Sequence, residues 1–221
     1  MDAYARTFGI ELVPCIQTLA HLHNALKWPL GETVKDTADI LQVGKEEVYT
    51  LIEKMLCSVK ESFSTNRVHL GMDEAAQLGL GKYLRENGYT KSSVLIREHS
   101  AAFEICKKLG LEPMIWSDMY ITANTGGSYY DVADDTDCSD WEKPDPELGL
   151  VYWDYYNPDQ EIYEKMIRVH QQLSNKSSLP EVLDLERNIT KLFQDLYLHP
   201  CGTCRMQKIS SAGSILYRLD G

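Results

Sequence analysis

The chain has 221 residues, enough for one domain of ordinary size, and a net charge of −11 at pH 7. This acidic balance argues against nucleic acid and anionic membrane surfaces as partners, because both are bound through basic patches. The chain has no apolar run near the ~20 residues of a membrane span and no basic-then-apolar leader, so we expect a cytoplasmic protein. Its six scattered cysteines fit reduced thiols better than a disulfide framework.

Apolar spacing and glycine stops divide the chain into alternating strands and helices. A short helix at 2–8 ends at Gly9, and the first strand is predicted at 10–16. The nearly continuous apolar run of this strand indicates a strand covered on both sides, as in a parallel sheet. The next predicted elements are helix 45–63, strand 68–70, helix 94–109 stopped by Gly110, strand 113–116, strand 150–154 and helix 160–173. This order predicts an α/β fold of repeated βαβ units with about four parallel strands.

Two adjacent acids, Asp73 and Glu74, follow the strand at 68–70 through Gly71. Adjacent side chains on a strand point to opposite faces, so these acids can share a role only if the backbone turns there, as Gly71 permits. An arbitrary Asp-Glu pair is more often a solvated loop start. Other candidate side chains lie in the carboxyl-terminal half of predicted strands or after them: His21, Trp116, Asp118, Tyr152, Trp153 and Asp154. In a (β/α)8 barrel the active site is built at the carboxyl ends of the strands, so we expect these residues to share one end of the sheet.

Several blocks of sequence carry a family resemblance. They are Gly9–Gln17, His69–Ala75, Leu78–Leu84, Pro113–Met119 and Tyr152–Tyr156. In this order they resemble the family 20 glycoside hydrolases, the β-N-acetylhexosaminidases, and especially the branch related to hexosaminidase D. The resemblance implies a partial (β/α)8 TIM barrel at residues 1–173 that holds family strands three to six, with a divergent helical or irregular tail at 174–221.

The resemblance does not extend to family strands one, two, seven and eight, or to the sugar-binding arginine at the end of strand one. We therefore expect an incomplete catalytic domain. An opened barrel leaves strand edges and an apolar face uncovered, which favours self-association.

The resemblance also implies a role for each candidate residue. Glu74 is the general acid, and Asp73 orients the substrate's 2-acetamido group, whose own oxygen attacks the anomeric carbon. Glu74 must then hold a proton near neutral pH while Asp73 stays charged, a split that burial or a neighbouring anion favours. The implied substrate-binding residues are His21 near the acids, Trp116 on the N-acetyl methyl or sugar face, Trp153 in the pocket wall, Tyr152 on the acetamido carbonyl, Asp154 on sugar hydroxyls, and Asp118 without a specific role. For the aromatic and histidine side chains, core packing is the alternative.

The implied function is a retaining exo-β-N-acetylhexosaminidase that removes terminal β-linked N-acetylglucosamine or N-acetylgalactosamine from glycans or glycosides. The resemblance implies neither a metal nor a cofactor. The alternative function is a non-catalytic remnant of this fold that binds carbohydrate weakly.

Two segments carry other signals. The acidic loop at 124–145 lacks the glycine and closing Glu of a calcium loop, and we interpret it as a βα loop over the barrel mouth. An amphipathic helix is predicted at 180–198, and residues 199–206 resemble the C-terminal histidine motif of glucose-methanol-choline flavin oxidoreductases. Those enzymes need a dinucleotide-binding G-x-G-x-x-G, which is missing from this sequence. Cys201 and Cys204 have the spacing of half a zinc site, but no second pair follows.

Overall fold

A three-stranded parallel sheet forms the centre of the molecule in the computed structural model, which describes residues 1–127, 129–130, 132–154, 157–174, 209–211 and 214–216. The strands lie in the order β1 (Arg67–His69), β2 (Glu112–Trp116) and β3 (Gly149–Val151). In the register, Val68 lies opposite Pro113, and Ile115 lies opposite Leu150. The predicted α/β class is confirmed, with three strands where about four were expected.

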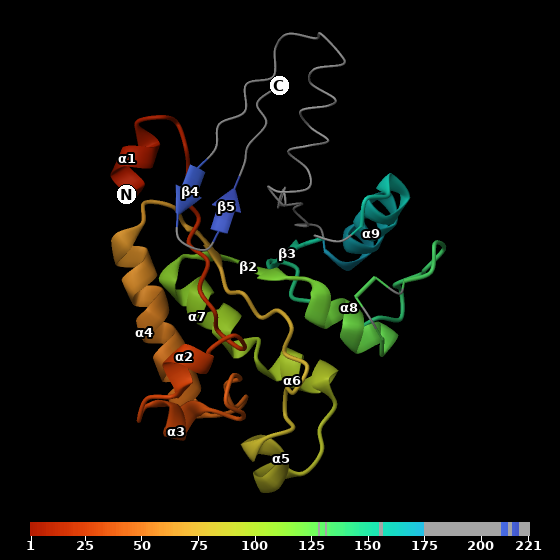
Figure 1. The fold of residues 1–221 in the computed structure, drawn as a ribbon, viewed down its shortest axis with the longest axis horizontal. Helices are drawn as coiled ribbons and strands as arrows, with labels where there is room; N and C mark the ends of the chain where they lie inside the picture. Colours follow the sequence, from red (N-terminus) through yellow and green to blue (C-terminus); the bar gives the residue numbers. More distant parts are fainter. Residues whose placement is uncertain (128, 131, 155–156, 175–208, 212–213, 217–221) are drawn as a thin grey trace.

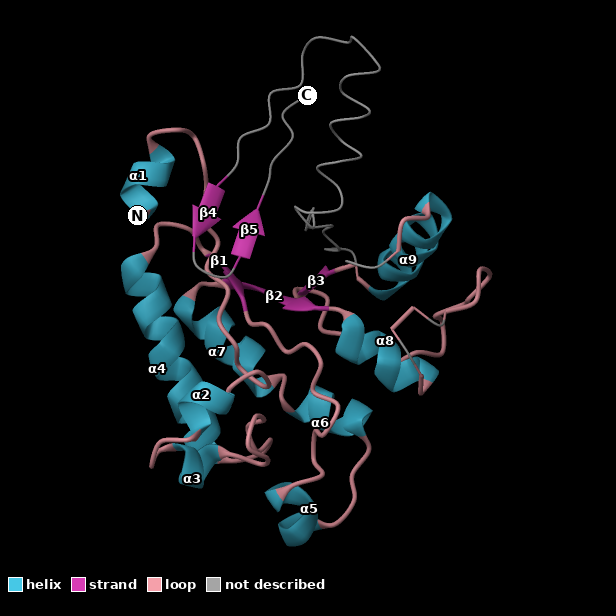
Figure 2. Cartoon of the chain, in the orientation of Figure 1, coloured by secondary structure: helices cyan, strands magenta, loops and turns pink. Residues whose placement is uncertain are grey.

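Helices make the connections that parallel strands require. Before β1 come α1 (Asp2–Arg6), α2 (His23–Leu26), α3 (Gly31–Val34) and α4 (Glu46–Ser62). Between β1 and β2 lie α5 (Lys82–Asn87), α6 (Ser92–Glu98) and α7 (Ala101–Leu109). Then α8 (Asp118–Thr125) connects β2 to β3, and α9 (Gln160–Leu173) follows β3. Helix α4 packs on α7, and α7 packs on β2 (Figures 1 and 2).

The two faces of the sheet differ because successive side chains on a strand alternate. Val68, Ile115 and Leu150 are fully buried and join one core with Leu56 of α4 and Phe103 of α7. The opposite face carries His69, Met114 and Trp116. Gly149 fits this face because a Cβ at that position would lie 2.8 Å from the Met114 side chain.

The prediction of a buried strand at 10–16 is wrong. Only the end of this segment pairs with β1: His69 N–H donates to Pro14 O (2.9 Å), and Ile16 N–H donates to His69 O (2.8 Å). Proline has no N–H for a ladder, and the Ile10 N–H is used by Ala5 O of α1. Leu12 and Val13 are half-buried rather than covered on both sides. A short parallel bridge therefore stands where the fourth strand was expected.

Other predicted elements are confirmed with changed limits. The helices at 45–63 and 160–173 correspond to α4 and α9, and α1 ends before Gly9 as expected. The helix predicted at 94–109 is two helices, because the backbone makes three-residue turns at His99 and Ser100. That break directs the His99 ring to Thr18 O (2.9 Å). Strand β3 ends at Val151 rather than at residue 154. Helices α2, α3, α5 and α8 were not predicted.

The tail is described only in part. The helix predicted at 180–198 and the motif at 199–206 lie outside the described residues. Two short strands in the tail, β4 (Ile209–Ser211) and β5 (Ser214–Leu216), pair antiparallel. Among the described helices, none has both the length and the apolar character needed to cross a bilayer.

Candidate active site

The turn after β1 has an unusual backbone. Gly71 has φ +69°, Met72 has φ 72° and Glu74 has φ 51°. L-residues other than glycine rarely adopt this left-handed conformation, which costs roughly 1–2 kcal/mol each. In the described part of the chain the non-glycine residues with positive φ are Met72, Glu74 and His21 (φ 57°). His21 and Glu74 are predicted site residues and Met72 directly precedes Asp73, so the strain is concentrated at the predicted site.

The turn brings both acids to one imidazole. His21 Nε2 lies 3.1 Å from Asp73 Oδ2 and 3.6 Å from Glu74 Oε2. The side chain of Asp73 is 19% exposed, that of His21 is 40% exposed and that of Glu74 is 58% exposed. The described residues therefore do not bury Glu74, which was one of the two conditions expected to favour its protonated form, whereas Asp73 is largely enclosed.

Gln17 orients Asp73 and was not predicted as a site residue. Its amide N–H donates to Asp73 Oδ1 (3.0 Å), and its Oε1 accepts the Met72 backbone N–H (3.3 Å). A Cβ on Gly71 would lie 2.1 Å from Gln17 Oε1, so this close approach needs glycine. One side chain thereby fixes both the strained backbone and the carboxylate that follows it.

Asp118 ties the ends of the three strands together. Directly after β2, its Oδ2 accepts the Glu74 backbone N–H (2.8 Å) and its Oδ1 accepts the indole N–H of Trp153 (3.3 Å). Burial raises the pKa of Asp118 to about 6, the two N–H donors oppose this, and nearby Asp73 adds to the rise. Asp118 therefore acts on the acid turn through its backbone, as a positioning residue.

The aromatic residues occupy two places. Trp153 stacks on Tyr129 of the acidic loop, with ring centroids 5.3 Å apart and an interplanar angle of 30°. The Tyr130 ring meets Trp153 edge-on at 6.3 Å. Trp116 instead contacts the His69 ring, with centroids 4.4 Å apart, on the face of the sheet opposite the main core. The predicted loop at 124–145 thus contributes an aromatic wall beside Trp153.

Tyr152 and Asp154 form a separate buried pair. The Tyr152 hydroxyl donates to Asp154 Oδ2 (2.7 Å), which also accepts the Asn157 side-chain amide (2.7 Å). Burial raises the pKa of Tyr152, and the bond to Asp154 raises it further. The Tyr152 hydroxyl is therefore a donor, and its predicted bond to an acetamido carbonyl would require it to leave Asp154.

A buried relay supports the aromatic wall from behind. His170 Nδ1 lies 2.6 Å from Met166 O, which can only accept, so this nitrogen carries the proton. His170 Nε2 then accepts from the Ser117 hydroxyl (2.6 Å), and Ser117 Oγ accepts from the Tyr129 hydroxyl (2.6 Å). The relay connects α9 to the ring that stacks on Trp153.

The family model described as glycosyl hydrolase family 20, catalytic domain, matches residues 1–155. The chain belongs to this family. No curated protein matches the sequence.

Solved family 20 structures share the fold at low identity. A β-N-acetylhexosaminidase from Bacteroides fragilis NCTC 9343 has TM-score 0.53 and 16% identity, over 77% of this chain and 33% of that one. An exo-β-N-acetylglucosaminidase from Vibrio harveyi, in complex with N-acetylglucosamine, has TM-score 0.55 and 18% identity, over 80% of this chain and 26% of that one. A β-N-acetylhexosaminidase from Streptomyces coelicolor A3(2) has TM-score 0.51 and 16% identity, over 81% of this chain and 31% of that one. This chain therefore spans no more than a third of the length of these three structures.

Within this family 20 chain, the predicted site residues fall into three groups. His21, Asp73 and Glu74 meet directly, while Asp118 and Trp153 join them through hydrogen bonds. Tyr152 pairs with Asp154, and Trp116 contacts His69. Sequence analysis missed four residues of this region: Gln17, Ser117, Tyr129 and His170. Gln17 and Ser117 carried a signal, because each directly follows a predicted strand in a block that resembles the family.

The described residues contain one group able to hold a metal ion, and it is the cluster of His21, Asp73 and Glu74.

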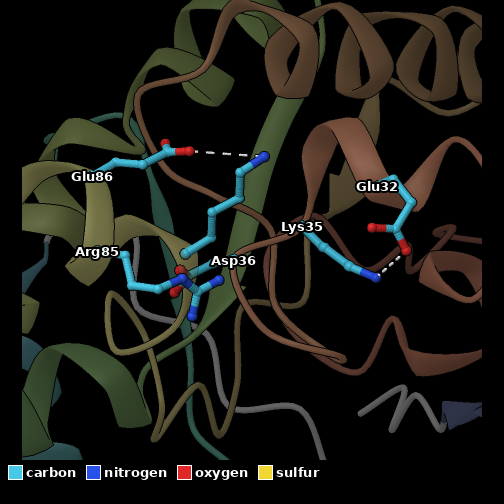
Figure 3. A pocket seen from close by; sticks show the side chains of 6 residues that line it. Glu32, Lys35, Asp36, Arg85 and Glu86 are labelled. Atoms are coloured by element: carbon cyan, nitrogen blue, oxygen red, sulfur yellow. Dashed lines mark hydrogen bonds and ion pairs between the residues drawn. The ribbon is translucent and has the colours of Figure 1, made fainter.

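A separate pocket of about 320 Å³ lies between α3 and α5, lined by Glu32, Lys35, Asp36, Lys82, Arg85 and Glu86 (Figure 3). Ion pairs within this pocket, from Lys35 to Glu32 and from Lys82 to Glu86, balance much of its charge. None of the predicted site residues lines this pocket.

Proposed function

We propose that this family 20 chain carries the acid pair of a retaining exo-β-N-acetylhexosaminidase. Its substrates would be terminal β-linked N-acetylglucosamine or N-acetylgalactosamine in glycans or glycosides. The observation that supports this most is the contact of one imidazole with two adjacent carboxylates after β1. The parallel sheet, with the site residues after its strands, is consistent with an arc of a (β/α)8 barrel.

The proposed mechanism divides the work between the two acids. Glu74 donates its proton to the leaving oxygen while the substrate's 2-acetamido oxygen attacks the anomeric carbon from the other side. Asp73 Oδ2 accepts the acetamido N–H, and the Gln17 bond to Oδ1 keeps that carboxylate in place. Water then opens the oxazolinium intermediate, with Glu74 taking back a proton, so the anomeric configuration is retained.

Glu74 needs a covered environment to hold its proton. Its side chain is 58% exposed here, so a bound sugar must supply much of that cover. Trp153 on its Tyr129 support provides an apolar surface of the kind that lines sugar and other small-molecule sites. Weak sugar binding is expected from this chain, because the resemblance assigns a sugar-binding arginine to a strand outside it.

The test is hydrolysis of a chromogenic N-acetyl-β-glucosaminide by the parent, by Glu74→Gln and by a matched control. Glu53 on α4 is exposed, and Glu53→Gln changes the same charge away from the site. We expect Glu74→Gln to lower kcat by at least about 100-fold, since general acid catalysis contributes roughly 10²–10⁴-fold. Equal rates for Glu74→Gln and the parent would contradict the assignment.

The second candidate is a non-catalytic remnant that binds carbohydrate weakly. It is favoured by the exposure of the Glu74 side chain. Folded parent protein that binds N-acetylglucosamine in ligand-detected NMR but releases no chromophore would support the remnant over the enzyme.

A further inference from the structure

The cluster of His21, Asp73 and Glu74 also has the geometry of a transition-metal site. Its three ligand atoms, His21 Nε2 and one oxygen of each carboxylate, lie within 4.8 Å of one another. We propose that this cluster binds Zn²⁺, and that the bound ion excludes an N-acetylhexosamine from the site. The exclusion of the sugar rests on the proposed function, whereas the binding of the ion does not.

The two separations from His21 fit a tetrahedral ion. Zinc bonds to imidazole nitrogen and carboxylate oxygen are about 2.0–2.2 Å, which puts neighbouring ligand atoms about 3.4 Å apart in a tetrahedron. The observed separations from His21 Nε2 are 3.1 Å to Asp73 and 3.6 Å to Glu74, on either side of that value. Small side-chain movements therefore suffice to admit the ion.

The surroundings hold the ligands in this arrangement. Gln17 donates to Asp73 Oδ1 at 3.0 Å and leaves Oδ2 directed at His21. Asp118 fixes the Glu74 backbone at 2.8 Å. Hydrogen bonds of this kind to metal-ligating carboxylates typically contribute 10–100-fold to metal affinity. Much of the ordering of the ligands therefore precedes binding of the ion.

The donor set selects the kind of ion. One imidazole nitrogen with two carboxylate oxygens suits zinc, whereas calcium takes six to eight oxygen ligands. Three protein ligands leave a fourth position for water, and the exposed side chains of His21 and Glu74 let the ion reach the site. The affinity should be weaker than that of four-ligand structural sites.

Bound zinc would compete with the proposed substrate. It would occupy the Glu74 oxygen that carries the catalytic proton and the Asp73 oxygen that accepts the acetamido N–H. Zinc should therefore inhibit hydrolysis reversibly, with recovery on adding a chelator.

The test is a titration of the full chain with ZnCl2, in which binding is measured by calorimetry in a buffer that does not bind zinc. Cys201 and Cys204 are also zinc-ligand types, so every protein carries Cys201→Ser and Cys204→Ser. We expect one Zn²⁺ per chain. His21→Asn should abolish the binding while tolerating the positive φ at this position, and Gln17→Leu should weaken it about 10–100-fold.

His23→Asn is the matched control, because His23 is an exposed histidine two residues away. It should bind Zn²⁺ as the parent does. Circular dichroism and the urea midpoint confirm that each variant is folded. Absence of binding by the parent, or equal binding by His21→Asn and the parent, would overturn the proposal. Calorimetry needs no turnover, so a failure here leaves the proposed hydrolase untouched, and a failed hydrolase assay leaves the zinc site untouched.

Discussion

The protonation of His170 should control the stability of the domain in mild acid. His170 is 2% exposed, and its ring accepts a hydrogen bond from the Ser117 hydroxyl while donating one to Met166 O. Burial lowers the pKa of His170 from 6.5 to about 4, although the Met166 bond opposes this. Protonation would replace the Ser117 acceptor with a second donor, so the buried relay cannot accommodate the imidazolium.

The direction and size of this change in stability with pH follow from the linkage between proton binding and folding. The pKa of His170 is lower in the folded state, so the unfolded chain binds more protons between about pH 4 and pH 6.5. The stability that His170 contributes is present above pH 6.5 and is lost as the pH falls toward 4. Between pH 7.5 and pH 5 this loss is about 2 kcal/mol, from 1.36 kcal/mol per pH unit.

The variant His170→Phe removes the titration together with both hydrogen bonds. At pH 7.5 it should be less stable than the parent by about 2 kcal/mol, since a lost hydrogen bond costs about 1 kcal/mol and an unpaired buried hydroxyl costs more. At pH 5 the parent has lost a similar amount of stability, so the two proteins should have nearly equal free energies of unfolding. The other buried histidines, His69 and His99, titrate in both proteins and cancel in the difference.

Urea unfolding followed by tryptophan fluorescence at the two pH values measures this difference, provided that the slopes agree. His23→Phe, at an exposed histidine, is the control and should stay within about 0.5 kcal/mol of the parent at both pH values. The same destabilisation by His170→Phe at pH 7.5 and pH 5 would refute the reasoning.

Three further substitutions, one of them with a control, test the packing at the site, in the sheet and beside α5. Gly71→Ala should displace Gln17, because the new Cβ would lie 2.1 Å from its Oε1, and should lower the rate of chromogenic substrate hydrolysis by about 10–100-fold. Ile115→Ala, on central strand β2 at 0% exposure, should lower the free energy of unfolding by about 2–5 kcal/mol in urea, whereas Leu84→Ala on α5 at 37% exposure should change it by less than about 1 kcal/mol. Asp36→Ala should lower the thermal midpoint, and it should lower the free energy of unfolding by at least about 2 kcal/mol. The reason is that this buried carboxylate accepts three backbone N–H groups of residues 79–83. An unchanged midpoint would mean that these donors find other partners.

What the sequence predicted well depends on short-range patterns. The helices α4 and α9 follow from apolar stripes, and the end of α7 follows from Gly110, which has φ +70°. The acid turn after β1 follows from Gly71 placed before two acids. Each of these signals is contained within one segment.

What the sequence could not predict depends on contacts between distant segments. Gln17 meets Asp73 across 56 positions, and Ser117 meets His170 across 53. No local pattern distinguishes such a serine or histidine from one that only fills the core. The predicted strand at 10–16 failed for a related reason, since an apolar run does not show whether distant segments cover its side chains or pair with its N–H groups.

The strained turn explains how two neighbouring acids serve one imidazole. In an extended strand the side chains of Asp73 and Glu74 would point to opposite faces, and His21 could contact only one of them. Left-handed backbone at Met72 and Glu74 removes that alternation, at a cost of roughly 1–2 kcal/mol for each residue. Gln17 binds the Met72 N–H and Asp118 binds the Glu74 N–H, so these two strained residues are held by side chains from two different segments of the chain. The acid pair is therefore a product of the assembled sheet, and substitutions at Gln17 or Asp118 should alter its geometry without touching either carboxylate.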